Sequence, residues 1–196
     1  PIRVWVPGCS TGEEVYSLAI SLLTFLGDVE ADIPIAIFAT DVNTGVLERA
    51  RAARYPESIE HDVSPALLQR FFTRTIGGYQ ISRAVRATCV FARHDITRDP
   101  PFSRIDLISC RNLMIYLGTA LQDRVMPVFH YALREPGFLV LGSAETVRSF
   151  VGFATVDARA LITEPSVWGW AGNFPDRSHF TEPGHAMLAQ FLSEQG

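Results

Sequence analysis

Lysine is absent from this chain of 196 residues, because all 17 of its basic residues are arginine. We interpret this bias as a coding preference of the source genome rather than as a functional feature. Positive charge is not in excess either, since 21 acidic residues bring the formal net charge to −4. A nucleic-acid-binding surface needs clustered positive charge, so nucleic acid is not an expected partner.

Cysteine is scarce, and long apolar runs are missing. The three cysteines (Cys9, Cys89 and Cys110) are odd in number and lack the short spacings of metal ligands, so we expect neither a disulfide framework nor a metal site. No run of about 18 apolar residues occurs, and no charged-then-apolar leader opens the chain. These features favour a cytoplasmic protein without direct membrane insertion, and they leave its oligomeric state open.

The composition predicts one well-buried domain. A hydrophobic content of 47% over 196 residues is hardly enough for two domains. Ile2 already lies inside the first predicted strand, and no residues before it could cover the edge of a sheet. We therefore expect a domain that belongs to a longer protein.

Buried strands alternate with helices at the start of the chain. Residues 2–6 predict a buried strand, and 35–39 is a short continuous apolar run, typical of a strand that is covered on both faces of a parallel sheet. Residues 13–26 have the apolar spacing of a helix, which Gly27 is expected to end, and 44–53 predicts the next helix. This order predicts an α/β fold with a mostly parallel sheet flanked by helices.

The middle of the chain is less regular. A helix is predicted over 64–74, with Ser64 as its N-cap. Strands over 79–82 and 87–92 follow the pair Gly77-Gly78. The region up to about Thr88 could be a small antiparallel excursion that recognises a partner, or a mere connector, and both interpretations stay open.

The remaining residues predict one more strand–helix–strand unit and an irregular end. Pro127 lies within the helical pattern and predicts a kink or a break there. Scattered glycine and proline from Pro165 onward predict an irregular tail. The predicted ranges are a strand at 105–109, a helix at 121–133, a strand at 138–141, a closing hairpin of 153–156 and 160–163, and a short helix at 185–193.

The most informative stretch joins the first strand to the first helix. It reads V-W-V-P-G-C-S-T-G-E-E-V-Y-S from Val4 to Ser17, a glycine-bracketed loop followed by Glu13 and Glu14. Such a loop lets the backbone approach a nucleotide-like cofactor closely. A phosphate would favour cations at this helix N-terminus, whereas two carboxylates suit a ligand with a cationic end. S-adenosylmethionine carries an ammonium and a sulfonium, so the stretch predicts methyl transfer.

Polar clusters follow four of the predicted strands. In open α/β sheets, ligands bind beyond the carboxyl ends of the strands, near the point where the strand order reverses. We therefore expect the four clusters to form one site. They are Gly8–Glu14, Asp41–Asn43, His94–Asp95 and Arg111–Asn112.

Two of the carboxylates have competing interpretations. Asp41 ends a strand, where it can accept hydrogen bonds from two ribose hydroxyls. Capping of the next helix is the alternative, although Asn43 already offers a cap. Glu14 either faces a ligand or compensates the helix dipole. A nicotinamide enzyme is disfavoured, because the first loop lacks the pattern G-x-G-x-x-G.

The later clusters give weaker signals. Asp95 can accept a hydrogen bond from an adenine amino group while Ile96 packs on the ring, and His94 is interpreted as an ordinary loop histidine. Arg111 follows a buried strand, and a buried arginine needs a carboxylate or a ligand as its partner. Tyr116 lies about one helical turn further on, either beside the same site or in the core.

At these residues the sequence resembles the CheR family of chemotaxis-receptor glutamate methyltransferases. The motifs are C-S-T-G-E-E-V-Y-S from Cys9, F-A-T-D-V-N from Phe38, C-R-N-L-M-I-Y-L from Cys110 and G-S-A-E from Gly142. The resemblance covers about residues 2–163. It implies a Rossmann-like class I domain that transfers a methyl group from S-adenosylmethionine to glutamates in the cytoplasmic domain of methyl-accepting chemotaxis receptors, leaving S-adenosylhomocysteine.

Carried over by position, the resemblance also implies roles for single residues. Residues 1–164 would form the methyltransferase domain, with a small β-subdomain at about 71–88 that helps to dock the receptor, and 165–196 would form the tail. Catalytic roles fall to Tyr116 and Arg111. Cofactor contacts fall to Glu14, Asp41, Asp95, Ile96, Arg111 and Asn112, and no metal is implied.

The sequence departs from the family pattern in three respects. Val15 stands where a proline is common, and Asp95 where an asparagine is frequent, which alters the charge. The family's helical N-terminal domain, which completes the cofactor and substrate site, is expected to be absent. The alternative function is therefore a non-catalytic domain that binds the cofactor or its product and regulates a larger signalling protein. A methyltransferase for small molecules would instead need a closed pocket.

Overall fold

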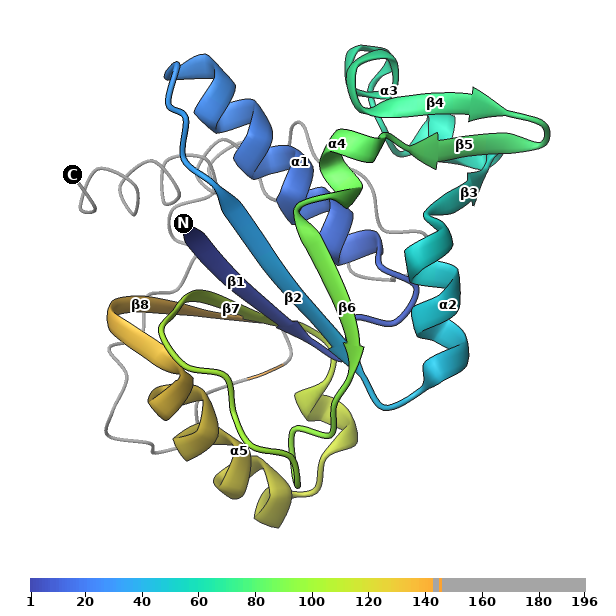
Figure 1. Ribbon diagram of the computed structural model, residues 1–196. Coiled ribbons are helices and arrows are strands. Elements are labelled where there is room, and N and C mark those ends of the chain that lie inside the picture. Colours follow the sequence, from blue (N-terminus) through green and yellow to red (C-terminus); the bar gives the residue numbers. More distant parts are fainter. Residues whose placement is uncertain (143–144, 146–196) are drawn as a thin grey trace.

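The computed structural model describes residues 1–142 and Glu145. Its main body is a five-stranded sheet in the order β6-β2-β1-β7-β8, and each neighbouring pair is parallel. This confirms the predicted α/β fold with a parallel sheet (Figure 1). The strands are β1 (Ile2–Pro7), β2 (Ile35–Asp41), β6 (Cys89–Arg93), β7 (Ile105–Cys110) and β8 (Leu133–Leu141).

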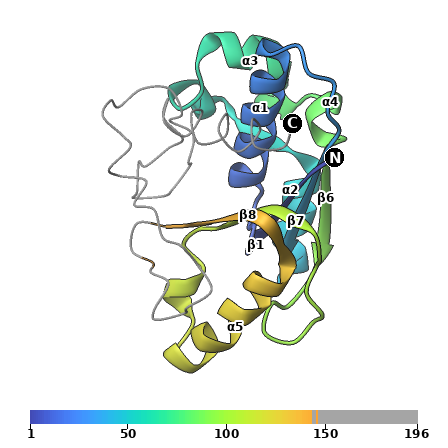
Figure 2. The same cartoon turned by 90° about the vertical axis from the view of Figure 1, so that its left-hand side faces the viewer.

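Helices cover both faces of this sheet. Helices α1 (Glu13–Asp28) and α2 (Thr44–Ala52) lie on one face and α5 (Thr119–Ala132) lies on the other, as Figure 2 shows. Successive side chains of a strand point to opposite faces, so Val4 packs in the core with α1 while Trp5 packs in the core with α5. Both side chains are 0% exposed. The apolar side chains of β1 are thus explained by burial on both faces of the sheet.

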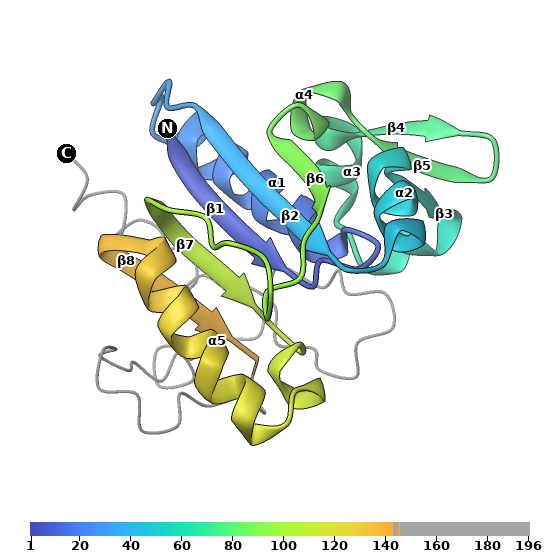
Figure 3. The same ribbon diagram turned by 60° about the horizontal axis from the view of Figure 1, so that its bottom comes forward.

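The strand order reverses next to β1. The chain proceeds from β1 to β2 and β6 on one side, and then crosses to β7 and β8 on the other. Figure 3 shows the strand ends pointing to one edge of the sheet. The carboxyl ends of β1 and β7 therefore flank the switch point, where open α/β sheets bind their ligands.

A small antiparallel sheet is inserted between α2 and β6, in the order β3-β5-β4. It confirms the antiparallel excursion, but the predicted range of 71–88 leaves out β3, which begins at Arg54. Figure 1 shows this insert beyond β6, at the edge of the main sheet. Its elements are β3 (Arg54–Pro56), the 3-10 helix η1 (Glu57–His61), α3 (Pro65–Phe71), β4 (Phe72–Thr75), β5 (Gly78–Ile81) and α4 (Arg83–Arg86).

Three boundary predictions are wrong, and each has a local cause. The predicted helix 64–74 ends at Phe71, because the next four residues pair with β5. Gly27 does not end α1, which continues to Asp28. A Cβ added at Gly27 would lie 3.0 Å from the guanidinium of Arg70, so the glycine leaves room for that side chain. The break predicted at Pro127 does not occur, because this residue lies inside a continuous α5 on its exposed side, where water can bind the carbonyl that loses its partner.

The predicted hairpin of 153–156 and 160–163, the domain boundary at 164, the tail 165–196 and its helix lie outside the described residues. Within the described part, no helix combines the length and the apolar character that crossing a bilayer requires.

Candidate functional site

The loop after β1 depends on two glycines in left-handed conformations. Gly8 has φ +68°, and Gly12, the N-cap of α1, has φ +91°. A Cβ on Gly12 would lie 3.1 Å from the Cβ of Ala50, so the start of α1 packs closely against α2. The amide of Cys9 donates to the Thr40 carbonyl (2.9 Å), which ties the loop to β2. The loop is therefore a rigid backbone cradle at the end of β1.

Asp41 anchors this cradle from the end of β2. Its Oδ2 accepts a hydrogen bond from the Ser10 amide (3.0 Å) and its Oδ1 accepts one from the Asn43 amide (2.9 Å). The cap of α2 is Asn43, whose Oδ1 accepts from the Gly45 amide (2.9 Å), so the capping interpretation of Asp41 is wrong. A carboxylate has about four acceptor positions, and two amides leave both Asp41 oxygens able to accept further hydrogen bonds.

The two acids that open α1 point in different directions. Glu13 accepts from the Thr11 hydroxyl at 2.6 Å, within its own loop. Glu14 reaches across to β7, where its Oε1 accepts from the Ser109 hydroxyl (2.5 Å). Glu14 thereby joins the ends of β1 and β7, on the two sides of the switch point.

The surroundings of Glu14 disfavour its charge. The residue as a whole is partly exposed, but its carboxyl group is enclosed by protein. Burial raises the pKa of Glu14 to about 7, against the lowering effects of the Ser109 hydrogen bond and of the Arg111 charge, while Glu145 raises it slightly further. A cation bound beside Glu14 would stabilise its ionised form.

The loop after β7 carries the next three predicted residues. Arg111 is partly exposed, and Asn112 has φ +57°. Leu113 follows, and its Cδ1 would lie 3.0 Å from a Cβ on Gly8, so this loop packs directly on the glycine cradle. Tyr116 ends the 3-10 helix η2 (Met114–Tyr116) and is 79% exposed, so the core interpretation of its ring is wrong.

The end of β6 supplies the remaining predicted residues. The His94 amide donates to the Asp41 carbonyl (3.1 Å), which places this turn beside the cradle. Asp95 accepts from the Thr97 hydroxyl (2.6 Å), a bond that lowers the pKa of Asp95. Ile96 is 8% exposed and belongs to the core on the α5 side.

His94 lies in the loop after β6, as expected, and its ring is buried. It is 9% exposed, and its ring meets the edge of Trp5 with centroids 5.5 Å apart. Its Nε2 lies 3.0 Å from the Pro100 carbonyl oxygen, which holds the ring in the core beneath the turn. Its role in the structure is thus packing, in agreement with its interpretation as an ordinary loop histidine.

Sequence reasoning missed three residues that shape the site. Ser109 holds Glu14, and the Tyr55 hydroxyl of the insert donates to the Thr11 carbonyl of the cradle (3.1 Å). Glu145 accepts hydrogen bonds from main-chain amides of the β7 loop. The only available signal was for Glu145, which lies in the motif G-S-A-E; contacts between residues so distant in the chain leave no local pattern.

The backbone and carboxylate groups at this edge of the sheet fit S-adenosylmethionine. The glycine backbone admits a ligand close to β1, the carboxyl of Glu14 faces the switch point, and Asp41 retains acceptor capacity. Cys9 borders the cradle as a buried free thiol, and burial raises its pKa to about 12, so it is no thiolate nucleophile at neutral pH. In the described part of the chain, no group of three or more His, Cys, Asp or Glu side chains could hold a metal ion.

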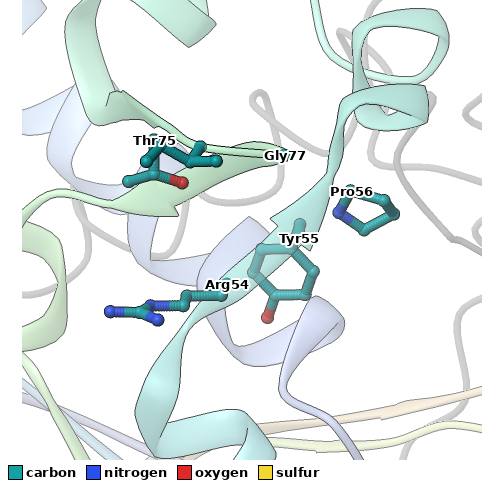
Figure 4. Close-up of a pocket in the computed structure, with 6 residues that line it drawn as sticks. Arg54, Tyr55, Pro56, Thr75 and Gly77 are labelled. Carbon is teal, nitrogen blue, oxygen red and sulfur yellow. The ribbon is translucent and has the colours of Figure 1, made fainter.

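A separate hollow of about 490 Å³ lies on the insert (Figure 4). It opens between β3 and the turn that joins β4 to β5. Ile76 at the tip of that turn is 107% exposed. The lining residues are Arg54, Tyr55, Pro56, Thr75, Ile76 and Gly77.

Comparisons with known proteins agree with this geometry. The family described as CheR methyltransferase, SAM binding domain, matches residues 1–160. Chemotaxis protein methyltransferase 2 of Pseudomonas aeruginosa is 36% identical over 153 residues, which is 74% of this chain and 53% of the relative. An uncharacterized 104.1 kDa protein of Rhodobacter capsulatus is 42% identical over 162 residues, 82% of this chain and 17% of the relative.

Among solved structures, PKMT2 from Rickettsia typhi in complex with AdoHcy has a TM-score of 0.45 and 13% identity, over 71% of this chain and 20% of that chain. The chain spans from about a sixth to about half of the two relatives above. Because the family match extends over most of its length, the chain belongs to the CheR methyltransferase family, as its S-adenosylmethionine-binding domain.

Proposed function

We propose that this domain serves a protein-glutamate O-methyltransferase that forms methyl esters on the cytoplasmic domain of chemotaxis receptors. The proposal rests on the acidic side chains Glu14 and Asp41 at the strand ends around the switch point, in a domain that belongs to this family. Relatives named chemotaxis protein methyltransferase, from Pseudomonas aeruginosa and from Salmonella typhimurium, are 36% and 33% identical. Their name supports a receptor substrate.

Each predicted residue has a task in this proposal. Asp41 would hold the ribose hydroxyls with the acceptor positions that the two amides leave open. Glu14 would face the cationic methionine end, and Asn112 would contact the cofactor from the β7 loop. Asp95 would accept a hydrogen bond from the adenine amino group, with Ile96 under the ring. When bound, the cofactor supplies an electrophilic methyl group on a sulfonium sulfur.

The receptor glutamate needs little chemical activation. Its carboxyl group has an ordinary pKa of about 4.3, so it is already an ionised nucleophile at neutral pH and requires no general base. The chain's tasks are then to align the incoming carboxylate and to exclude water. Arg111 would supply positive charge near the reacting groups. Tyr116, exposed on η2, would position the substrate.

The insert is a proposed docking element for the receptor. The hydroxyl of Tyr55, from β3, donates to the Thr11 carbonyl, so the small sheet is joined directly to the cradle (3.1 Å). The hollow beside Arg54 and Ile76 lies on the same sheet. A receptor segment held there would be connected to the cofactor loop through β3.

A second function is favoured by one observation. The chain corresponds to 17% of the 104.1 kDa relative, so this domain also occurs within a much larger protein. A domain that binds the cofactor or its product and regulates the rest of such a protein, without transferring a methyl group, is the alternative.

Methyl incorporation separates these two functions. The chain should transfer a tritiated methyl group from S-adenosylmethionine to a purified receptor cytoplasmic domain, and mild alkali should release it as methanol. A receptor with its acceptor glutamates changed to glutamine is the control. Binding of S-adenosylhomocysteine by the chain without any incorporation would support the regulatory alternative instead.

Tyr116→Phe tests the catalytic side of the proposal. We expect turnover to fall by roughly tenfold, the worth of about one hydrogen bond, while the affinity for S-adenosylhomocysteine changes by less than about twofold. Tyr131→Phe is the matched control, because Tyr131 is also exposed (68%) but lies on α5. Equal turnover in both variants would remove Tyr116 from the reaction.

A further inference from the structure

Glu145 is a buried acid to which the proposed function gives no role. It is 9% exposed, and both carboxylate oxygens accept hydrogen bonds from main-chain amides. Oε1 accepts from Met114 (2.6 Å) and Ile115 (3.4 Å). Oε2 accepts from Gly142 (2.7 Å) and Asn112 (3.0 Å). One carboxylate thus accepts hydrogen bonds from four main-chain amides, three in the loop after β7 and one at the end of β8.

The loop after β7, which Glu145 holds through these hydrogen bonds, contains the predicted site residues Asn112 and Tyr116. Asn112 adopts φ +57°, a conformation that side-chain-bearing residues rarely take, and its amide is fixed by Glu145. Tyr116 ends η2, whose first residue donates the shortest of the four hydrogen bonds. Leu113, between the two, packs on Gly8 of the cradle. A shift of the carboxylate would therefore move both sides of the site.

The hydrogen-bond count argues against direct contact of Glu145 with a ligand. A carboxylate has about four acceptor positions, and four amides occupy them. The isolated negative charge is stabilised by these donors, as at a helix N-terminus, rather than being left open at the surface. The group acts on the site through the backbone that it holds.

We propose that Glu145 is a positioning residue for methyl transfer: its carboxylate sets the backbone of residues 112–115 and so places Asn112 and Tyr116 against the glycine cradle. The proposal rests on the proposed function for the role of Tyr116. For Asn112 it depends only on the cofactor site.

Conservative variants distinguish this role from simple packing. Glu145→Gln keeps the size but turns an amino group toward two N–H donors, whichever way the amide is oriented. Glu145→Asp keeps two acceptor oxygens on a shorter side chain. If the loop requires two acceptor oxygens, the Glu145→Asp variant should keep binding that the Glu145→Gln variant loses. This is expected even though glutamine is closer than aspartate to glutamate in shape.

The readout is binding of S-adenosylhomocysteine to the 196-residue chain by isothermal titration, alongside thermal unfolding. We expect Glu145→Gln to weaken binding by at least about tenfold and Glu145→Asp to recover most of that loss, consistent with one or two lost charge-assisted hydrogen bonds. Asp106→Asn is the matched control. Asp106 is a buried acid of β7 at 2% exposure, it also accepts a main-chain amide, and it lies at the opposite end of the strand. Its variant should lower the melting temperature and leave the affinity within about twofold.

Gly142→Ala gives a second route to the same contact. A Cβ there would lie 2.8 Å from Glu145 Oε2 and 2.8 Å from Asn112 Oδ1, so it should displace both side chains and weaken binding while Glu145 keeps its charge. This variant replaces Glu145→Gln if the latter does not fold.

Three results would overturn the proposal. They are wild-type affinity in a folded Glu145→Gln, wild-type affinity in Gly142→Ala, and affinity losses that simply follow melting temperature across all variants including Asp106→Asn. Failure of the proposed function looks different, because the wild-type chain would then bind S-adenosylhomocysteine but methylate no receptor.

Discussion

The two ends of the parallel sheet satisfy their acids differently. At the amino end, Asp106 accepts from the Arg3 amide (2.6 Å) and forms an ion pair with the Arg134 guanidinium. At the carboxyl end, Glu14 meets a serine hydroxyl and Asp41 meets two main-chain amides. Figure 3 shows the amino and carboxyl ends of the strands at opposite edges of the sheet.

The difference shows which end of the sheet is built for a ligand. A chain that pairs its buried acid with its own arginine has neutralised that charge, and nothing further is required there. The hydroxyl and amide donors at the carboxyl end orient Glu14 and Asp41 without cancelling their charge. The Arg111 charge also acts on Glu14 and lowers its pKa, and a cation bound at this end would stabilise both carboxylates. The same residue type is thus structural at one end and available for binding at the other.

Asp41→Ala should weaken cofactor binding at the carboxyl end of the sheet more than any other change. Each hydrogen bond to a charged group is worth about 1.5–3 kcal/mol, so losing two from the ribose should weaken S-adenosylhomocysteine binding by at least ~100-fold. Loss of the anchor for Ser10 adds to this. Titration calorimetry measures the effect, and Glu48→Ala, the same charge change at an exposed position of α2, is the control. Equal affinity in the Asp41 variant would place the ribose elsewhere.

Glu14→Gln tests whether the acid at the switch point is kept at a cost in stability. Burial raises its pKa from 4.5 to about 7, so the folded protein binds a proton that the unfolded chain has released between those values. The contribution of Glu14 to stability should therefore be fully present below about pH 4.5 and be lost as pH rises through about 7, by up to about 3 kcal/mol.

Urea unfolding of both proteins between pH 5 and pH 8 measures this change. We expect the free energy of unfolding to fall with pH in the wild type relative to Glu14→Gln, which keeps an acceptor for Ser109 but cannot ionise. Parallel pH profiles for the two proteins would show that Glu14 is already ionised throughout that range.

The elements around the site were predictable because burial on both faces leaves a strong pattern. The strands β1, β2 and β7 are mostly apolar and largely buried, and the glycine loop directly follows β1. Short elements were not predictable. Arg54–Pro56 has no apolar pattern of its own and becomes β3 only by pairing with β5, and Phe72 continues a helical pattern that pairing overrides.

The candidate site divides in the same way. Asp41, Glu14 and Arg111 could be predicted because each directly follows a strand or opens a helix. Glu145 could not be assigned a role, because three of its four partners lie 30 to 33 residues away and all four are backbone amides, which carry no residue-specific signal. The burial of His94 likewise depends on aromatic side chains from β1 and a distant loop, namely Trp5 and Phe102.

Asp106→Asn should change the amino end alone, with the smallest effect of the three. The variant loses a charge-assisted bond to the Arg3 amide and leaves Arg134 unpaired, but the Arg134 side chain is 38% exposed and stays hydrated. We therefore expect a loss of about 1–3 kcal/mol in the free energy of unfolding, with unchanged S-adenosylhomocysteine affinity. Adding Arg134→Gln should cost less than the sum of the two single changes, because both remove one interaction. Strictly additive losses would mean that the pair is not coupled, and the contrast between the two ends would then rest on the binding end alone.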